Sequence, residues 1–206
     1  MRLLFLLLFL LLFASSAHAS SYTAERFDSR VEVMTGGSLR VTETMVFRFE
    51  SGTFTRVFRT IPTRRTDGVE FISASMDNVP MPEGDGPGHV RRRRQNGVRI
   101  EWLFAPTGPS THTFVLTYEV AGVAHRVDGS DVVAWRALPT EHAYRIEASR
   151  IEIVSPAQVL GTPALEMRRV GQYHIEQTGS GVAVEASAIG KNGWLEISLR
   201  FDEGSV

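Results

Sequence analysis

One glutamate falls where a strand pattern requires an apolar side chain. Apolar residues alternate along one run of the chain, at Leu39, Val41, Met45 and Phe47. Odd positions of an extended strand share one face, so Glu43 lies on the apolar face with them. A buried carboxylate needs a positively charged partner, or it takes up a proton. Glu43 is therefore a general acid or half of a structural ion pair, unless this face opens to water at an edge.

Several arginines could interact with acidic groups. Arg48, Arg56 and Arg59 are close enough in sequence to neutralise Glu43. A separate run of four, Arg91, Arg92, Arg93 and Arg94, could bind phosphate of lipids or another anionic polymer. Alternate members of a strand point to opposite faces, so only half of the run could contact one surface. The other interpretation is a solvated edge strand whose charges prevent aggregation.

Aromatic residues offer a second kind of binding surface. Trp102, Trp135 and Trp194 could stack on sugar rings or fill the core. Trp102 belongs to an alternating apolar run and is expected in the core. Trp135 and Trp194 lie beside turn residues, so either role is open, and Trp135 joins the four arginines as a candidate binding residue.

No metal or cofactor site is predicted. The chain has no cysteine, and the histidines after residue 19 do not form pairs at the spacing of metal ligands. The loop Asp128-Gly129-Ser130-Asp131 lacks the spacing of a calcium-binding loop. Nucleophile-elbow, phosphate-loop and dinucleotide-binding motifs are absent from the sequence. A formal net charge of -1 also lacks the excess of positive charge that is typical of nucleic-acid-binding proteins.

The fold class follows from the spacing of apolar residues. Period-two alternation recurs, as at 39–49, 98–104 and 114–120, whereas helical spacing never persists over three turns. Asn96-Gly97 is a strong hairpin signal, with 91–95 as the partner strand. We expect about nine or ten strands in an all-β antiparallel sandwich, immunoglobulin-like in general architecture. Little helix is expected, with one or two helical turns at 164–170.

The chain divides into two parts. Residues 1–19 read as a signal peptide, with Arg2, an apolar run and the site Ala17-His18-Ala19. The rest, 20–206, is predicted to form one exported domain, periplasmic or extracellular. Segment 155–163 could mark a boundary within it. Two Gly-rich or Pro-rich stretches, 77–88 and 121–131, are expected to be surface loops.

Three motifs together resemble a known bacterial family. They are Gly37-Ser38-Leu39-Arg40-Val41-Thr42-Glu43, then Phe58-Arg59-Thr60-Ile61-Pro62, then the strand ending at Tyr118 with Gly122 and Trp135 after it. This succession is similar to the predicted membrane proteins known as domain of unknown function twenty-two-zero-seven. The resemblance spans about Phe27 to Phe201 and implies an exported β-sandwich at the N-terminal side of a membrane helix. This chain stops at Val206, so a membrane is expected as a partner only if the natural chain continues.

The resemblance places Glu43 in the first family motif and Arg59 in the second. If they lie on adjacent strands, they form a buried or half-buried ion pair that fixes strand register. The resemblance implies no catalytic residue. We therefore expect a non-catalytic interaction module that binds an envelope protein or polymer. The alternative is a hydrolase of envelope glycans or peptides that uses carboxylates such as Glu43 and Glu101, although alternation places Glu101 opposite the Trp102 face.

Overall fold

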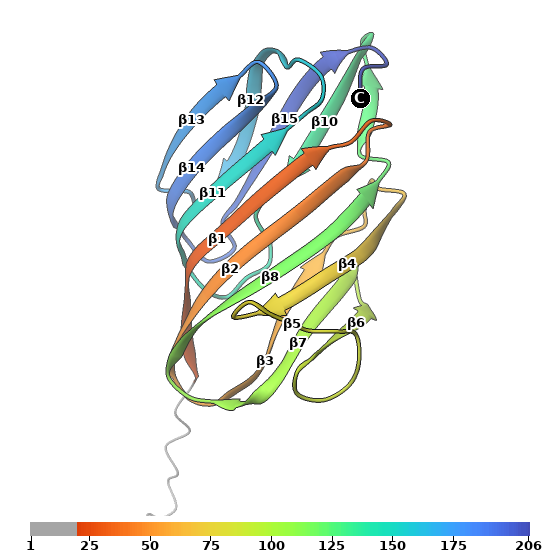
Figure 1. Cartoon of the computed structure of the whole chain (residues 1–206). Helices are drawn as coiled ribbons and strands as arrows, with labels where there is room; N and C mark the ends of the chain where they lie inside the picture. Colours follow the sequence, from red (N-terminus) through yellow and green to blue (C-terminus); the bar gives the residue numbers. More distant parts are fainter. Residues whose placement is uncertain (1–19) are drawn as a thin grey trace, which may run out of the picture.

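A computed structural model describes residues 20–206, and the predicted signal peptide at 1–19 lies outside the described residues. Within this part the chain forms fifteen strands and no helix, so the all-β prediction is confirmed (Figure 1). The strands are grouped into three sheets. No helix of residues 20–206 could cross a membrane.

The largest sheet has eight strands in the order β13-β14-β11-β1-β2-β8-β4-β5. Every neighbouring pair in it is antiparallel except β1 and β11, which are parallel. Its strands are β1 (Ser21–Val33), β2 (Leu39–Ser51), β4 (Gly68–Met76), β5 (Val79–Pro80), β8 (Ser110–Ala121), β11 (Ile146–Val154), β13 (Gln172–Thr178) and β14 (Gly181–Ile189).

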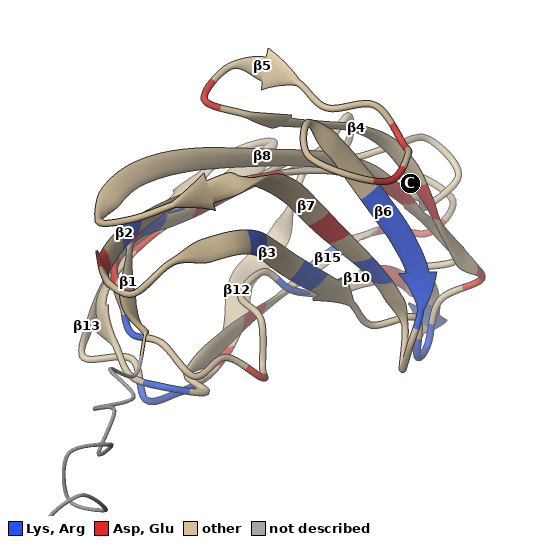
Figure 2. Cartoon of the chain, turned by 90° about the horizontal axis from the view of Figure 1, so that it is seen from below, with Lys and Arg blue, Asp and Glu red and all other residues tan. Residues whose placement is uncertain are grey.

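Two smaller sheets cover one face of the large one, as Figure 2 shows. One has the order β3-β7-β6 and the other β12-β15-β10-β9. Their strands are β3 (Phe54–Ile61), β6 (His89–Arg94), β7 (Val98–Thr107), β9 (Ala124–Val127), β10 (Ser130–Arg136), β12 (Leu160–Arg168) and β15 (Trp194–Asp202). The buried core lies between the layers, so the molecule is a sandwich.

Alternation along the strands separates this core from solvent. In β2 the odd-numbered residues from Leu39 to Phe49 are buried, as the sequence predicts. The outer face of the large sheet instead carries arginines paired with carboxylates across neighbouring strands. Arg40 lies 2.7 Å from Glu119, and Arg150 lies 2.7 Å from Glu185. This face is therefore polar, with its charges balanced locally.

Two of the sequence predictions are wrong. The helical turns expected at 164–170 are not formed, because residues 160–168 form β12, where Leu165 pairs with Ile197 of β15. Tertiary pairing overrides the local helix preference there. The loop expected at 121–131 contains the β9–β10 hairpin. Asp128 and Gly129 both have positive φ, 49° and 72°, which suits the two-residue turn between these strands.

Candidate functional site

Glu43 is fully buried and holds three short hydrogen bonds. Arg59 donates from Nε to Oε2 and from Nη2 to Oε1, each over 2.7 Å. The Tyr118 hydroxyl donates to Oε1 over 2.9 Å. Glu43 has 0% exposure and Arg59 has 6%. The paired guanidinium and carboxylate form a bidentate ion pair, which satisfies both charges inside the core.

The pair joins two sheets rather than two adjacent strands. Glu43 lies on β2 of the eight-stranded sheet, and Arg59 lies on β3 of the three-stranded sheet. The buried ion pair thus forms although the condition of adjacent strands is not met. The chain passes from β2 to β3 through Gly52 and Thr53, and Gly52 has a φ of 90° that favours glycine. After this corner β3 faces β2 across the core, and the ion pair spans the two layers.

Burial and charge act together on the titration of this cluster. Burial opposes the charge of Arg59, but the Glu43 carboxylate outweighs it and raises the pKa of the guanidinium. Burial raises the pKa of the Tyr118 phenol, and the neighbouring Glu43 carboxylate raises it further. Nearby, burial also raises the pKa of Tyr144. All three shifts favour the protonated forms of Arg59, Tyr118 and Tyr144, and two of these groups, Arg59 and Tyr118, donate hydrogen bonds to Glu43.

Glu101 is a second buried carboxylate, on the outer face of the three-stranded sheet. It has 6% exposure. Three arginines screen it: its carboxylate lies 3.0 Å from Arg99, 3.5 Å from Arg93 and 4.0 Å from Arg91. Strand pairing explains this grouping, because Arg91 is the cross-strand partner of Glu101 and Arg93 that of Arg99. We call Glu101, Arg91, Arg93 and Arg99 the arginine cluster.

An exposed aromatic ring borders the arginine cluster. Phe58 of β3 is the cross-strand neighbour of Glu101 and is 51% exposed. The guanidinium of Arg99 lies 3.6 Å from the centre of the Phe58 ring, which is a close cation–π contact. Asp85 lies 2.6 Å from Arg91 and is the other acidic group in contact with the cluster. The outer face of this sheet thus combines excess positive charge with an exposed apolar ring.

The four consecutive arginines are divided between two faces. Arg91 and Arg93 belong to the arginine cluster, whereas Arg92 pairs with Glu83 at 3.0 Å. Arg94 is exposed and forms no ion pair within residues 20–206. Figure 2 shows this stretch as a blue strand at the sheet edge.

The basic charge is concentrated in one part of the chain. The three strands β3, β6 and β7 contain seven arginines and one acidic residue, although the whole chain has a formal net charge of -1. The three-stranded sheet is therefore a basic region on an otherwise acidic molecule, and such asymmetry attracts anions.

The tryptophans do not add to a binding surface. Trp102 is fully buried and donates from Nε1 to the Ser75 carbonyl oxygen over 3.1 Å, so its expected core position is confirmed. Trp135 is 7% exposed and packs in the core beside Val133, two residues away on the same strand. The prediction of Trp135 as a candidate binding residue is therefore wrong, because alternation in β10 turns it inward. Trp194 lies under Arg136, whose guanidinium is 4.4 Å from the ring centre.

Glu43 and Glu101 do not open onto a shared cleft. Glu43 points into the core toward the inner face of the β3-β7-β6 sheet, where Arg59 meets it. Glu101 pairs across strands with Phe58, the residue before Arg59, and so belongs to the opposite face of that sheet. The carboxylate pair considered for a hydrolase is thus separated by the sheet itself. Among residues 20–206 no group of three or more His, Cys, Asp or Glu side chains could hold a metal.

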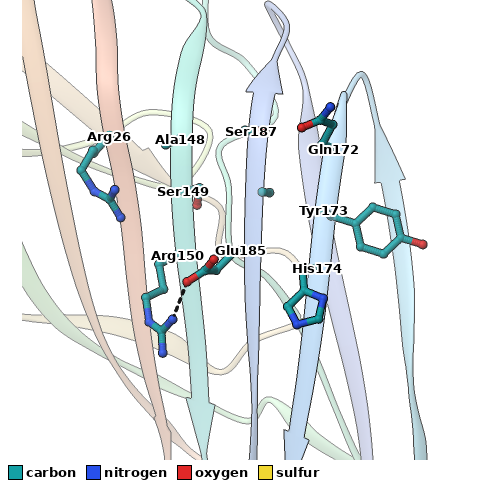
Figure 3. A pocket seen from close by; sticks show the side chains of 10 residues that line it. Arg26, Ala148, Ser149, Arg150, Gln172, Tyr173, His174, Glu185 and Ser187 are labelled. Carbon is teal, nitrogen blue, oxygen red and sulfur yellow. Dashed lines mark hydrogen bonds and ion pairs between the residues drawn. The ribbon is translucent and has the colours of Figure 1, made fainter.

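A shallow hollow lies on the outer face of the large sheet, over β11, β14 and β13 (Figure 3). Its volume is about 380 Å³, and small side chains such as Ala148 and Ser187 form part of its lining. Arg150 and Glu185, which line it, neutralise each other over 2.7 Å. Arg26, which also lines the hollow, pairs with Asp28 over 2.9 Å, so these arginines are neutralised locally, in contrast to the arginine cluster.

Sequence reasoning identified Glu43, Arg59 and the arginine run but missed two residues of the basic face, Arg99 and Phe58. Phe58 begins the motif Phe58-Arg59-Thr60-Ile61-Pro62, and Arg99 lies within the alternating run 98–104. Only the cross-strand pairing places Arg99 beside Arg93, and Phe58 beside Glu101. The β6–β7 hairpin needs the exact register to be known, and the pairing of β3 with β7 joins strands about forty residues apart in sequence.

Solved structures share the fold at low sequence identity. A proposed nutrient-binding protein from Legionella pneumophila aligns with a TM-score of 0.58 and 11% identity over 86% of this chain and 66% of that one. Yeast LTA4 hydrolase aligns with a TM-score of 0.58 and 8% identity over 87% of this chain and 30% of the enzyme. An M1 zinc metallopeptidase from Deinococcus radiodurans aligns with a TM-score of 0.52 and 11% identity over 85% of this chain and 42% of the enzyme.

This chain thus spans between 30% and 66% of the length of those three structures, and the likeness shows the fold alone. A comparison with curated protein sequences found no match. A family model described as the N-terminal domain of a predicted membrane protein (DUF2207) matches residues 23–201.

Proposed function

Because this chain belongs to the DUF2207 family of predicted membrane protein N-terminal domains, we propose that it is a non-catalytic binding module of the cell envelope. The arginine cluster would be its binding surface. Its partner would be an anionic envelope protein or polymer. The signal peptide predicted at 1–19 supports export to a periplasmic or extracellular location.

The observation that carries this proposal is the excess of arginine around Glu101. One carboxylate needs one bidentate arginine, as Glu43 demonstrates with Arg59. Glu101 instead has three arginines within 4.0 Å. Packing like charges together opposes folding, so the excess is better explained by an external anion than by stability. The exposed Phe58 ring adds an apolar contact beside the charges.

A charge-neutralising double variant tests the proposal. We expect Arg91→Gln with Arg93→Gln to weaken binding to a heparin column and to phosphatidylglycerol vesicles by roughly 30-fold, at about 1 kcal/mol per arginine. Higher salt should also weaken the binding of the unmodified protein to both anionic probes. Phosphatidylcholine vesicles provide the uncharged reference.

The matched control is Arg30→Gln with Arg40→Gln. Both arginines are exposed on the outer face of the large sheet and pair with carboxylates there. The control removes the same number of charges from a face that is locally balanced. Equal loss in the two double variants, or no retention of the unmodified protein on either anionic probe, would contradict the proposed binding surface.

A further inference from the structure

Strand β6 is an edge strand whose first half is covered and whose second half is open. The Val90 amide donates to the Pro82 carbonyl oxygen over 2.9 Å, and the Gly84 amide donates to the Val90 carbonyl oxygen over 2.9 Å. Glu83 and Val90 form a parallel bridge at this point. The incoming segment 82–84 thus acts as a short extra strand alongside the start of β6. It turns away at Asp85, whose side chain pairs with Arg91.

The open half presents unpaired main-chain groups. The Gln95 amide donates to the Gly97 carbonyl oxygen over 3.0 Å, so odd-numbered residues of β6 bond toward β7. Val90 bonds outward, and by the same alternation Arg92 and Arg94 direct their amide and carbonyl groups away from β7. Within residues 20–206 these outward groups of Arg92 and Arg94 have no hydrogen-bond partner. An edge of this kind can accept a further strand.

A hollow lies beside the open half of β6. It has a volume of about 290 Å³ and is lined by Val69 of β4, Val98 of β7 and residues 92–94. Val98 is nearly buried and Val69 is half-buried, so part of the lining is apolar. A strand added to β6 would direct alternate side chains toward this hollow and toward the arginine cluster.

The arginines of β6 indicate which charge a strand added to this edge should carry. Arg91 and Arg93 lie on the outer side, and Arg94 on the inner side forms no ion pair within residues 20–206. A basic strand would be repelled at every position. The geometry points to an extended acidic segment of a partner protein that adds as a strand to residues 92–94 of β6. This inference rests on the proposed function, because it takes the arginine cluster as the binding surface.

Main-chain pairing favours a polypeptide over another polyanion. Strand addition draws affinity from main-chain hydrogen bonds and specificity from alternate side chains. A glycan or a lipid headgroup would use only the arginine side chains. The two kinds of partner therefore differ in whether the outward amide of Arg92 matters.

Arg92→Pro and Arg92→Gln form a matched pair for the test. Both remove the same charge, but only proline removes the outward amide. Proline at an edge position leaves the β6–β7 ladder in place, because the lost amide does not face β7. The probe is an acetylated eight-residue peptide of alternating Glu and Val, titrated by calorimetry. A peptide with proline in place of a central valine is the reference that cannot add as a strand.

We expect Arg92→Gln to weaken binding of the Glu-Val peptide a few-fold and Arg92→Pro to weaken it at least tenfold more. Thermal melts establish whether the proline variant is folded. Independently of any variant, the peptide should slow amide hydrogen exchange at Arg92 and Arg94 in the unmodified protein, while exchange across β13 stays unchanged.

The outcomes separate the two proposals. Equal losses in the two Arg92 variants, or equal binding of the proline-containing peptide, would reject strand addition. If heparin retention still depended on Arg91 and Arg93, the proposed function would stand with a polymer as partner. If neither peptide nor polyanion bound, both proposals would fall. Were Arg92→Pro unfolded, the exchange measurement alone decides, and unchanged exchange at Arg92 and Arg94 would reject strand addition.

Discussion

Glu43 and Glu101 are both buried but are neutralised in opposite ways. Glu43 lies in the core with one bidentate arginine and a tyrosine hydroxyl. Glu101 lies on an outer face, covered by three arginines that are themselves partly exposed. In the first case the protein supplies every partner and excludes water. In the second, solvent and external ions reach the arginines.

If the proposed function is right, the difference separates structural from functional use of the same residue types. A buried ion pair whose hydrogen bonds are complete has no capacity for a ligand, and its removal acts on folding. A cluster with surplus positive charge at the surface adds little stability, but it attracts anions. Under the proposed function, burial of a carboxylate would not by itself indicate its role, and the exposure of its partners would distinguish the two cases.

The largest effect is expected from breaking the core pair. Glu43→Gln or Arg59→Leu alone should lower the free energy of unfolding by about 3 to 5 kcal/mol, because each leaves an uncompensated charge or polar group in the core. Urea denaturation measures this. The double variant should lose less than the sum of the single losses, since neither partner is then left alone. Small and additive losses would show that the two side chains do not interact in solution.

A smaller effect is expected from alkaline pH. Burial raises the pKa of Tyr118 and Tyr144 in the folded state, whereas an unfolded tyrosine ionises near pH 10. Above this pH the folded state binds more protons than the unfolded state, so stability is complete below about pH 10 and falls as the pH rises. Each of the two tyrosines contributes a loss of about 1.4 kcal/mol per pH unit there.

Urea midpoints at pH 8 and pH 11 test this expectation. Tyr118→Phe should be less stable at pH 8, because it loses a hydrogen bond to Glu43. Its free energy of unfolding should fall less steeply between pH 8 and pH 11 than that of the unmodified protein. If Tyr118→Phe lost stability with pH as steeply as the unmodified protein, the ionisation of other groups would cause the loss at alkaline pH.

The smallest effect on stability is expected at the arginine cluster. Glu101→Gln should lower the free energy of unfolding by about 1 kcal/mol or less, because the partners of Glu101 are reached by solvent and salt. It should also strengthen heparin binding, since one negative charge leaves a basic surface. Salt titrations of both variants sharpen the comparison. The loss of unfolding free energy in Glu101→Gln should vary with ionic strength, and the loss of unfolding free energy in Glu43→Gln should not. A loss at Glu101 as large as that at Glu43 would remove the distinction.

The sequence predicts the local features that depend on alternation. It places Glu43 on the apolar face of its strand, Trp102 in the core and the consecutive arginines on two faces. These inferences need only the period of a strand. They hold because each strand has one face on the core and one toward solvent.

The pairing of strands is beyond such reasoning. Two strands joined by two residues usually form a hairpin, but Gly52 and Thr53 instead carry the chain into another sheet. Register is equally sensitive. A two-residue loop at Asn96-Gly97 would place Arg92 opposite Glu101, whereas the observed pairing of Arg94 with Val98 places Arg91 there. A shift of one residue exchanges the two faces, so the make-up of the arginine cluster depends on the whole fold.

The parallel pairing of β1 with β11 has a consequence for how the chain reaches its final shape. The first strand lies in the middle of the large sheet, and one of its two neighbours comes from residues 146–154. A ribosome releases the N-terminal half long before that neighbour exists, leaving one edge of β1 unsatisfied. We expect slow, late completion of folding, as is typical of contacts between distant parts of a sequence. Any fragment that ends before residue 146 should aggregate through that open edge.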